Sequence, residues 1–67
     1  MTRQSDVEVR HHGSIYLVVP HTQAARDWVD DHIPDDAQWW AGGFAVEPRY
    51  LDDILVGMDD AGLRVAA

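Results

Sequence analysis

The doublet Asp-Asp occurs four times in this sequence, and these doublets hold most of its acidic side chains. Eight of the 12 acids lie in Asp30-Asp31, Asp35-Asp36, Asp52-Asp53 and Asp59-Asp60. Paired carboxylates can hold a divalent cation, or they can present phosphate-like negative charge to a basic partner. The spacing of the doublets and the elements that carry them decide between these two kinds of chemistry.

The spacing argues against a cation. No D-x-D-x-D-G loop is present, and adjacent aspartates on a helix diverge by about 100°. Four histidines could also serve as ligands, but no two are four residues apart on a helix and no cysteine accompanies them. They are His11, His12, His21 and His32. We therefore expect no metal site and no cofactor.

Catalytic chemistry has equally little support. Ser14 opens an apolar run and is not part of a G-x-S-x-G motif, and the chain has no cysteine nucleophile. Paired carboxylates for glycoside chemistry need a deep cleft, which 67 residues can hardly enclose. We expect a binding protein and not an enzyme.

The spacing of the aspartate doublets agrees better with a surface that presents phosphate-like charge than with a metal site or a catalytic site. Asp52 and Asp59 are seven residues apart, so on a helix they share a stripe about 10 Å long. Asp27, Asp30 and Asp31 face outward on an earlier predicted helix, and with the Asp35-Asp36 turn we expect these acids to merge into one anionic surface. Aspartate is a poor helix former, so local stability does not explain the choice.

The overall charge limits the possible partners. The formal charge is -7, and all five basic residues are arginines scattered singly along the chain. Direct binding to nucleic acid needs clustered cations, so we do not expect it. Two interpretations of the acids stay open: they keep a small protein soluble, or they bind a basic protein surface that normally holds nucleic acid.

The tryptophans are candidate apolar contacts. Trp28 falls on a helical stripe and is expected in the core. Trp39 and Trp40 are adjacent, and in an extended chain they point to opposite faces. One of them can therefore be an exposed interface anchor, or the pair can cover the open end of a small core.

The first half of the chain predicts a β-hairpin followed by a helix. Residues 7–10 alternate apolar and polar, which suits an edge strand, whereas residues 14–19 are apolar on both faces, which suits a central strand. The hairpin turns near Gly13, with His11 and His12 in the turn. Thr22 caps a helix that runs to about Ile33. Its stripe toward the core is Ala25, Trp28, Val29, His32 and Ile33, with His32 at the flank of the helix.

Pro34 ends that helix in a type I turn over residues 33–36. Gly42-Gly43 indicates either a two-residue hairpin or a glycine bulge before a strand at residues 44–47. A second helix begins near Pro48 and ends in a Schellman motif with Gly62 left-handed and Leu63 folded back on Met58. Its buried stripe is Leu51, Ile54, Leu55 and Met58. A short strand at residues 63–65 follows.

These elements predict a single α+β domain over residues 1–67, with residues 1–6 disordered. We expect one sheet of three to five short strands, covered on one face by two helices. The order is ββαβαβ, or a ferredoxin-like βαββαβ with an added N-terminal strand if the Gly-Gly hairpin forms. The longest apolar run is six residues, Ile15–Pro20, so we expect neither a signal peptide nor a membrane span. Together with the lack of cysteine, this favours the cytoplasm.

Three segments carry a resemblance to known proteins: residues 34–43, residues 46–50 and residues 57–63. They resemble short uncharacterised proteins of phages and mobile elements in Gram-negative bacteria, over most of residues 14–65. The resemblance implies a genetic context and a bacterial host cell, and no functional residue carries over from it. Anti-CRISPR proteins that mimic DNA are similar in size and acidity.

The leading hypothesis is an inhibitor, an anti-CRISPR that acts by occupying the nucleic-acid-binding surface of a host complex, such as a CRISPR effector subunit. The expected interface consists of Asp27, Asp30, Asp31, Asp35, Asp36, Asp52, Asp53, Asp59, Asp60, Trp39 and Trp40. The alternative is an accessory regulator or antitoxin-like module that binds through the edge strand at residues 7–10 or through the Trp39-Trp40 patch. We expect no membrane partner, and a monomer or weak homodimer.

Overall fold

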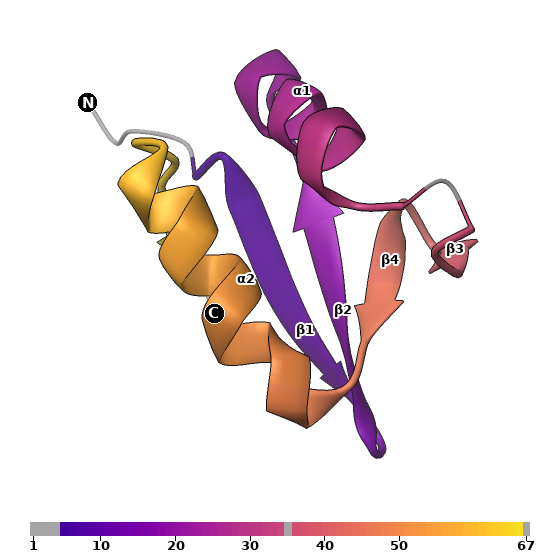
Figure 1. The fold of residues 1–67 in the computed structure, drawn as a ribbon. Coiled ribbons are helices and arrows are strands. Elements are labelled where there is room, and N and C mark those ends of the chain that lie inside the picture. Colours follow the sequence, from indigo (N-terminus) through magenta and orange to yellow (C-terminus); the bar gives the residue numbers. More distant parts are fainter. Residues whose placement is uncertain (1–4, 35, 67) are drawn as a thin grey trace.

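The computed structural model describes residues 5–34 and 36–66, which form one sheet and two helices (Figure 1). In chain order the elements are β1 (Val7–His12), β2 (Ile15–Pro20), α1 (Gln23–His32), β3 (Trp39–Trp40), β4 (Gly43–Val46), α2 (Pro48–Asp60) and β5 (Val65–Ala66). This is a small α+β fold, as the sequence predicted. The order ββαββαβ contains the second hairpin that the sequence had left open.

The sheet has the strand order β3-β4-β2-β1-β5. β1 pairs antiparallel with β2 from Val7↔Pro20 to His12↔Ile15, and β5 pairs parallel with β1 at Val7 and Glu8. The central position of β2 is confirmed, but the prediction of an edge strand at residues 7–10 is wrong at Val7 and Glu8, because β5 covers them. The placement of His11 and His12 in the turn is also wrong, since both belong to β1.

Both helices lie on the same face of the sheet (Figure 1). Thr22 is the N-cap of α1, and its Oγ1 accepts a hydrogen bond of 3.2 Å from the backbone N–H of Ala25. α2 begins at Pro48, where the first turn of a helix loses no hydrogen bond. Both starts were predicted, because capping chemistry is local to the sequence.

The core fills the space between the helices and this face of the sheet. The buried members of its cluster are Val7, Val18, Ala25, Val29, Phe44, Val46, Leu51, Met58 and Leu63. Trp28 packs against the cluster, and a Cβ at Gly57 of α2 would lie 3.0 Å from its Cζ2 atom. Glycine at this position therefore lets the indole of α1 approach α2. His32 is exposed, in agreement with its expected place at the flank of α1, and its ring stacks on Trp28 at 4.2 Å between centroids.

The second hairpin turns one residue earlier than expected. Ala41 and Gly42 both have positive φ, 51° and 82°, as a two-residue type I′ loop requires. Gly43 belongs to β4, where a Cβ would lie 2.6 Å from the carbonyl oxygen of Val18. The structure therefore has the hairpin of the two predicted alternatives, with Gly42 in its loop, while Gly43 allows β4 to approach β2 closely.

The end of α2 is the Schellman motif predicted from the sequence. Gly62 has φ 84°, its N–H donates to the carbonyl of Asp59 at 2.9 Å, and the N–H of Leu63 donates to the carbonyl of Met58 at 3.0 Å. The turn after α1 differs slightly from its prediction. Ala37 donates to the carbonyl of Pro34, one residue beyond the predicted span, and Asp35 within that span lies outside the described residues.

Asp6 joins the two ends of the chain to α1. Its side chain accepts hydrogen bonds from Thr22 Oγ1 at 2.7 Å and from the backbone N–H of Arg64 at 2.9 Å, and its own N–H donates to the carbonyl of Arg64. The prediction of a disordered segment at residues 1–6 is therefore wrong at Asp6, whereas residues 1–4 lie outside the described residues.

Candidate partner interface

The aspartates of the doublets stand on the solvent side of the helical layer. α1 carries three exposed aspartates and α2 carries four, and one more follows α1 in the loop before β3. They are Asp27, Asp30, Asp31, Asp36, Asp52, Asp53, Asp59 and Asp60. Asp35, the remaining predicted acid of the interface, lies outside the described residues. The outward placement follows from helical geometry, because the apolar stripes of both helices face the core.

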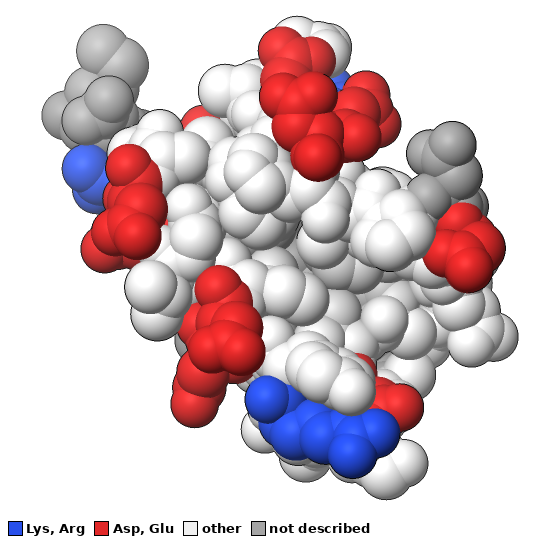
Figure 2. Space-filling view, in the orientation of Figure 1, with Lys and Arg blue, Asp and Glu red and all other residues white. Residues whose placement is uncertain are grey.

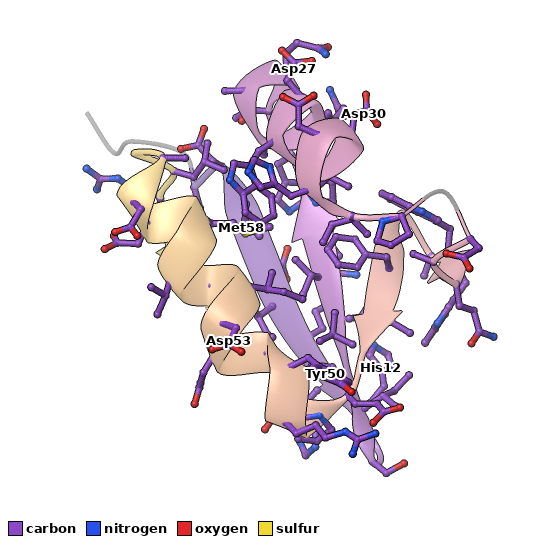
Figure 3. The ribbon with its side chains drawn as sticks, in the orientation of Figure 1. His12, Asp27, Asp30, Tyr50, Asp53 and Met58 are labelled. Atoms are coloured by element: carbon purple, nitrogen blue, oxygen red, sulfur yellow. The ribbon has the colours of Figure 1, made fainter. Side chains whose placement is uncertain are left out.

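These carboxylates form separate groups and do not merge into one surface. Figure 2 shows red side chains over α1, at two places along α2 and toward the β3 side, with a pale surface between them. The single continuous anionic surface expected from the sequence is therefore wrong. The reason lies in the packing, since α1 and α2 run at a wide angle to each other and leave apolar side chains between their acidic faces (Figures 1 and 3).

No cation of the described chain neutralises these acids. The salt bridges within residues 5–34 and 36–66 join Glu8 to Arg10 and His21, and Glu47 to Arg49. The side-chain oxygen of Asp27 accepts a hydrogen bond of 2.9 Å from Gln23, which is a neutral donor. The aspartates of the helical layer therefore have no salt-bridge partner among the described residues.

The four acids of α2 form two doublets along the helix. Asp52-Asp53 and Asp59-Asp60 are seven residues apart, or about 10 Å of helix axis. One DNA strand has about 3.4 Å per phosphate, so the distance between the doublets corresponds to about three phosphates. Asp59 and Asp60 also stand in the last turn of α2, where a negative charge opposes the helix dipole.

Trp39 and Trp40 point to opposite sides of the sheet, as an extended chain requires. Trp39 is 48% exposed and its ring lies 5.3 Å from that of Phe44, on the helical side. It also borders a hollow of about 310 Å³ next to α1, together with Val29 and Asp30. Trp39 is therefore an apolar side chain at the margin of the α1 acids.

Trp40 has a different environment. It is 39% exposed, and its ring meets that of His12 edge-on at 4.9 Å between centroids. β4 and β2 lie between β3 and β1 in the sheet, so this contact bridges the face away from the helices. Leu17 of β2 faces that side and has no exposed surface. Trp40 therefore belongs to the packing of the protein more than Trp39 does.

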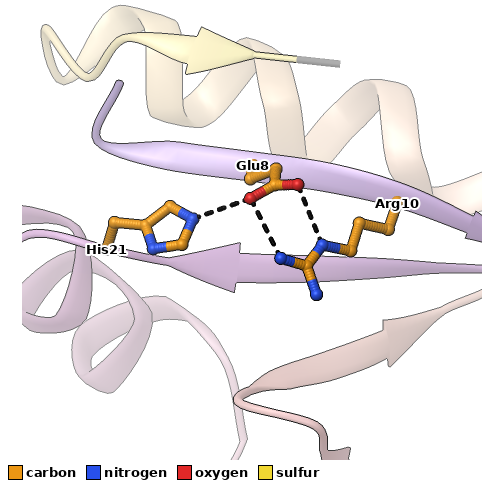
Figure 4. Close-up of polar contacts among 3 residues, drawn as sticks. All are labelled: Glu8, Arg10 and His21. Atoms are coloured by element: carbon orange, nitrogen blue, oxygen red, sulfur yellow. Dashed lines mark hydrogen bonds and ion pairs between the residues drawn. The ribbon is translucent and has the colours of Figure 1, made fainter. Parts of the chain in front are cut away.

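The face of the sheet away from the helices carries a compact charge network that the sequence reasoning missed. Glu8 Oε2 accepts a hydrogen bond from Arg10 Nε at 2.8 Å, and Glu8 Oε1 lies 2.9 Å from Nε2 of His21 (Figure 4). Hydrogen bonds from Arg10 and then from His21 lower the pKa of Glu8 to about 2. The i, i+2 spacing of Glu8 and Arg10 on one strand was the available signal, because such residues share a face.

The histidines are dispersed over the fold. His11 stacks on Tyr16 at 4.7 Å, His12 contacts Trp40, His21 binds Glu8, and Nδ1 of His32 lies 2.8 Å from the carbonyl oxygen of Trp28. Within the described residues, no group of three or more histidine, cysteine or acidic side chains is placed to hold a metal ion.

Comparison of the chain with protein-family models, curated proteins and solved structures finds no match. In the part of the chain that the structure describes, no helix has the length and apolar character needed to cross a membrane. The arguments about function therefore depend on the charge and shape of the molecule itself.

Proposed function

We propose that this chain is an inhibitory binding protein of a phage or mobile element, and specifically an anti-CRISPR. It binds a nucleic-acid-handling complex of the bacterial host through the aspartates of its helical layer. It acts by occupying a basic surface that otherwise holds nucleic acid, without turnover, and it does so in the cytoplasm of the host cell.

The observation that carries this proposal is the unneutralised charge of α2. Its four aspartates are exposed, have no salt-bridge partner among the described residues, and form two doublets about 10 Å apart along the helix axis. A basic channel attracts such a stripe at long range and loses affinity for it as salt rises. The choice of a bacterial defence complex as the target follows the sequence expectation from residues 34–43, 46–50 and 57–63, for which no comparison gives a match.

Trp39 extends the same interface at its margin. Its exposed ring borders the same hollow as Asp30 and Arg26, so an apolar contact adjoins the charged side chains of α1. Exposed tryptophans are enriched among the residues that dominate binding energy. Trp40 contributes less, because its ring is engaged with His12.

The experiment measures the binding of labelled target DNA to a purified CRISPR effector complex as this protein is added. The wild type should displace the DNA, with an apparent affinity that falls as salt rises. The variant Asp52→Arg/Asp53→Arg/Asp59→Arg/Asp60→Arg should lose this activity while keeping its fold, because arginine is the better helix former. Glu8→Gln, which removes an acid from the opposite face of the sheet, is the matched control and should inhibit normally. Full inhibition by the folded quadruple variant would refute the proposal.

A second candidate is an accessory regulator or antitoxin-like module that binds through an edge strand or through Trp39 and Trp40. Both indoles are more than one third exposed, and β5 pairs only with Val7 and Glu8, which leaves Val9 to His12 unpaired on that side among the described residues. Such a module should form a homodimer or partner complex that resists salt and is lost on Trp40→Ala.

A further inference from the structure

An apolar hollow lies on the helical layer, between the end of α1, strand β4 and the first turns of α2. Its volume is about 270 Å³. Most of its lining is apolar, and the residues that define it are Ile33, Pro34, Ala37, Phe44, Tyr50 and Ile54. The hollow lies on the side of the fold where α1 and α2 diverge (Figure 1), above the buried side chains of Phe44 and Val46 in β4.

Tyr50 is the exposed aromatic side chain of this lining. It is 52% exposed, stands on the first turn of α2 and lies beside β4 in Figure 3. The guanidinium of Arg49 lies 4.9 Å from the centre of its ring, and the same arginine bonds to Glu47 at 2.9 Å. Tyr50 therefore lines the hollow, and the Arg49 guanidinium beside its ring is already bonded to the carboxylate of Glu47.

The acids around the rim of the hollow outnumber its cations. Glu47 is part of the lining and is paired with Arg49 at 2.9 Å. Asp36 precedes Ala37 in the chain and Asp53 precedes Ile54 on α2, and both are exposed and have no salt bridge among the described residues. Figure 3 places Asp30 on α1 and Asp53 on α2, on either side of the pale surface in Figure 2. An apolar hollow with carboxylates around it favours a ligand that has an apolar centre and cationic flanks.

The size and charge decide the occupant. A volume of 270 Å³ is below the range of about 300–1,000 Å³ of pockets for drug-sized molecules, and it suits one or two side chains of a protein. A second copy of this chain is a poor candidate, because its charge of -7 would bring like charges to the same rim. In a segment rich in lysine or arginine, the cations can pair with the acids around the hollow, and a large apolar residue can fill the hollow itself.

We propose that the hollow bordered by Tyr50 and Ile54 receives a large apolar side chain from a lysine- or arginine-rich segment of the partner protein. This inference rests on the proposed function, because it assumes that the partner's surface is basic. The inference goes beyond the proposed function because it explains how the protein selects one basic partner surface among many. The aspartates attract any basic surface, whereas the hollow selects surfaces with an apolar residue among their cations.

The test uses synthetic peptides as probes and follows backbone amide signals of the protein by NMR. One peptide has a leucine flanked on each side by four lysines, a second has serine in place of the leucine, and a third keeps the leucine between glutamates. The leucine-lysine peptide should bind about tenfold more tightly than the serine peptide, and it should shift the signals of Ile33 and Ile54. The glutamate peptide should not bind.

Two substitutions on α2 provide a matched pair. Tyr50→Ser should remove most of the preference for leucine, whereas Val56→Ser should keep it, because Val56 is equally exposed at 60% but does not line the hollow. Both residues are largely exposed, so both variants should fold.

The outcomes separate the two proposals. Equal binding of the leucine and serine peptides would overturn the hollow as an anchor site and leave the acidic interface standing. Binding of neither lysine peptide would overturn both. Self-association that is lost in Tyr50→Ser would assign the hollow to a second copy, and tight binding of the glutamate peptide would show that the rim does not select cations. Either result would also overturn the inference.

Discussion

The two faces of the sheet use negative charge in opposite ways. On the face away from the helices, Glu8 is held between Arg10 and His21, so its charge is neutralised within the fold. On the helical layer, four aspartates of α2 have no salt bridge within the described residues. The carboxylate of Glu8 therefore contributes interactions within the fold, whereas the carboxylates of the α2 aspartates form no ion pair within the described residues.

Apolar side chains show the reverse arrangement. Leu17 faces the side without helices and is fully buried, whereas the helical side keeps an open hollow next to Tyr50. The face that no helix covers is therefore closed by its own side chains, and the face with two helices is left incomplete. Both contrasts support the proposal that a partner binds on the helical layer.

The strongest test of this comparison is Leu17→Ala. If the side without helices is a packed surface, this substitution should lower the free energy of unfolding by about 2–5 kcal/mol, as for other fully buried leucines. Urea denaturation followed by circular dichroism measures the change. Val56→Ala on the helical layer, where the side chain is 60% exposed, should change stability by less than about 0.5 kcal/mol.

A small effect of Leu17→Ala would break the comparison. It would mean that Trp40 and its neighbours do not cover β2, and that this side of the sheet is also open to a partner. Trp40→Ala separates these cases, because loss of a structural cover should lower stability, whereas loss of a free anchor should not.

The local features of this fold could be predicted from the sequence because their causes are local. Thr22 as a cap, Pro48 as a helix start and Gly62 as a helix end each depend on residues within one turn. The outward placement of the α2 aspartates follows from helical periodicity in the same way.

The features that could not be predicted depend on long-range packing. β5 comes from the other end of the chain and pairs with β1 at Val7 and Glu8. The residues around Val7 therefore could not show that this part of β1 is not at the edge of the sheet. The divergence of α1 and α2 separates the acidic groups and creates the hollow at Tyr50, and no periodicity encodes that angle. The pairing of Glu8 with His21 joins residues 13 apart, across the hairpin.

The second test measures how much the acids at the end of α2 lower the free energy of unfolding. Asp59 and Asp60 lie in the last turn of α2, where a positive charge is favoured by the helix dipole. Asp59→Arg/Asp60→Arg should therefore raise the free energy of unfolding, by about 0.3–1 kcal/mol for each residue at low salt. The gain should shrink at high salt, which thermal unfolding at two salt concentrations would measure.

The combination of this result with the DNA-displacement assay sharpens the comparison. A variant that is more stable and yet inactive would mean that the acids are retained for binding at the expense of the fold. A double variant that is less stable than the wild type would mean that Asp59 and Asp60 support α2 through contacts of their own, and the contrast between the two faces would fail.

The smallest expected effect is on acid stability, and it tests the other side of the contrast. The pKa of Glu8 is lowered from 4.5 to about 2, first by the hydrogen bond from Arg10 and then by that from His21. A group whose pKa is lower in the folded state stabilises the fold above its unfolded pKa, and this contribution is lost as pH falls from about 4.5 to about 2. Glu8→Gln should therefore be less stable than the wild type at neutral pH, and the two stabilities should converge as pH approaches 2.

Stability measured by urea denaturation at several pH values would show this convergence. The Arg10→Gln background provides the control, because it removes the larger cause of the lowered pKa and should reduce the effect of Glu8→Gln. If the wild type and Glu8→Gln differ by the same amount at every pH, the carboxylate of Glu8 is not held by its neighbours. Its charge would then be as free as that of the α2 aspartates, and the two faces would no longer be distinguished by neutralisation.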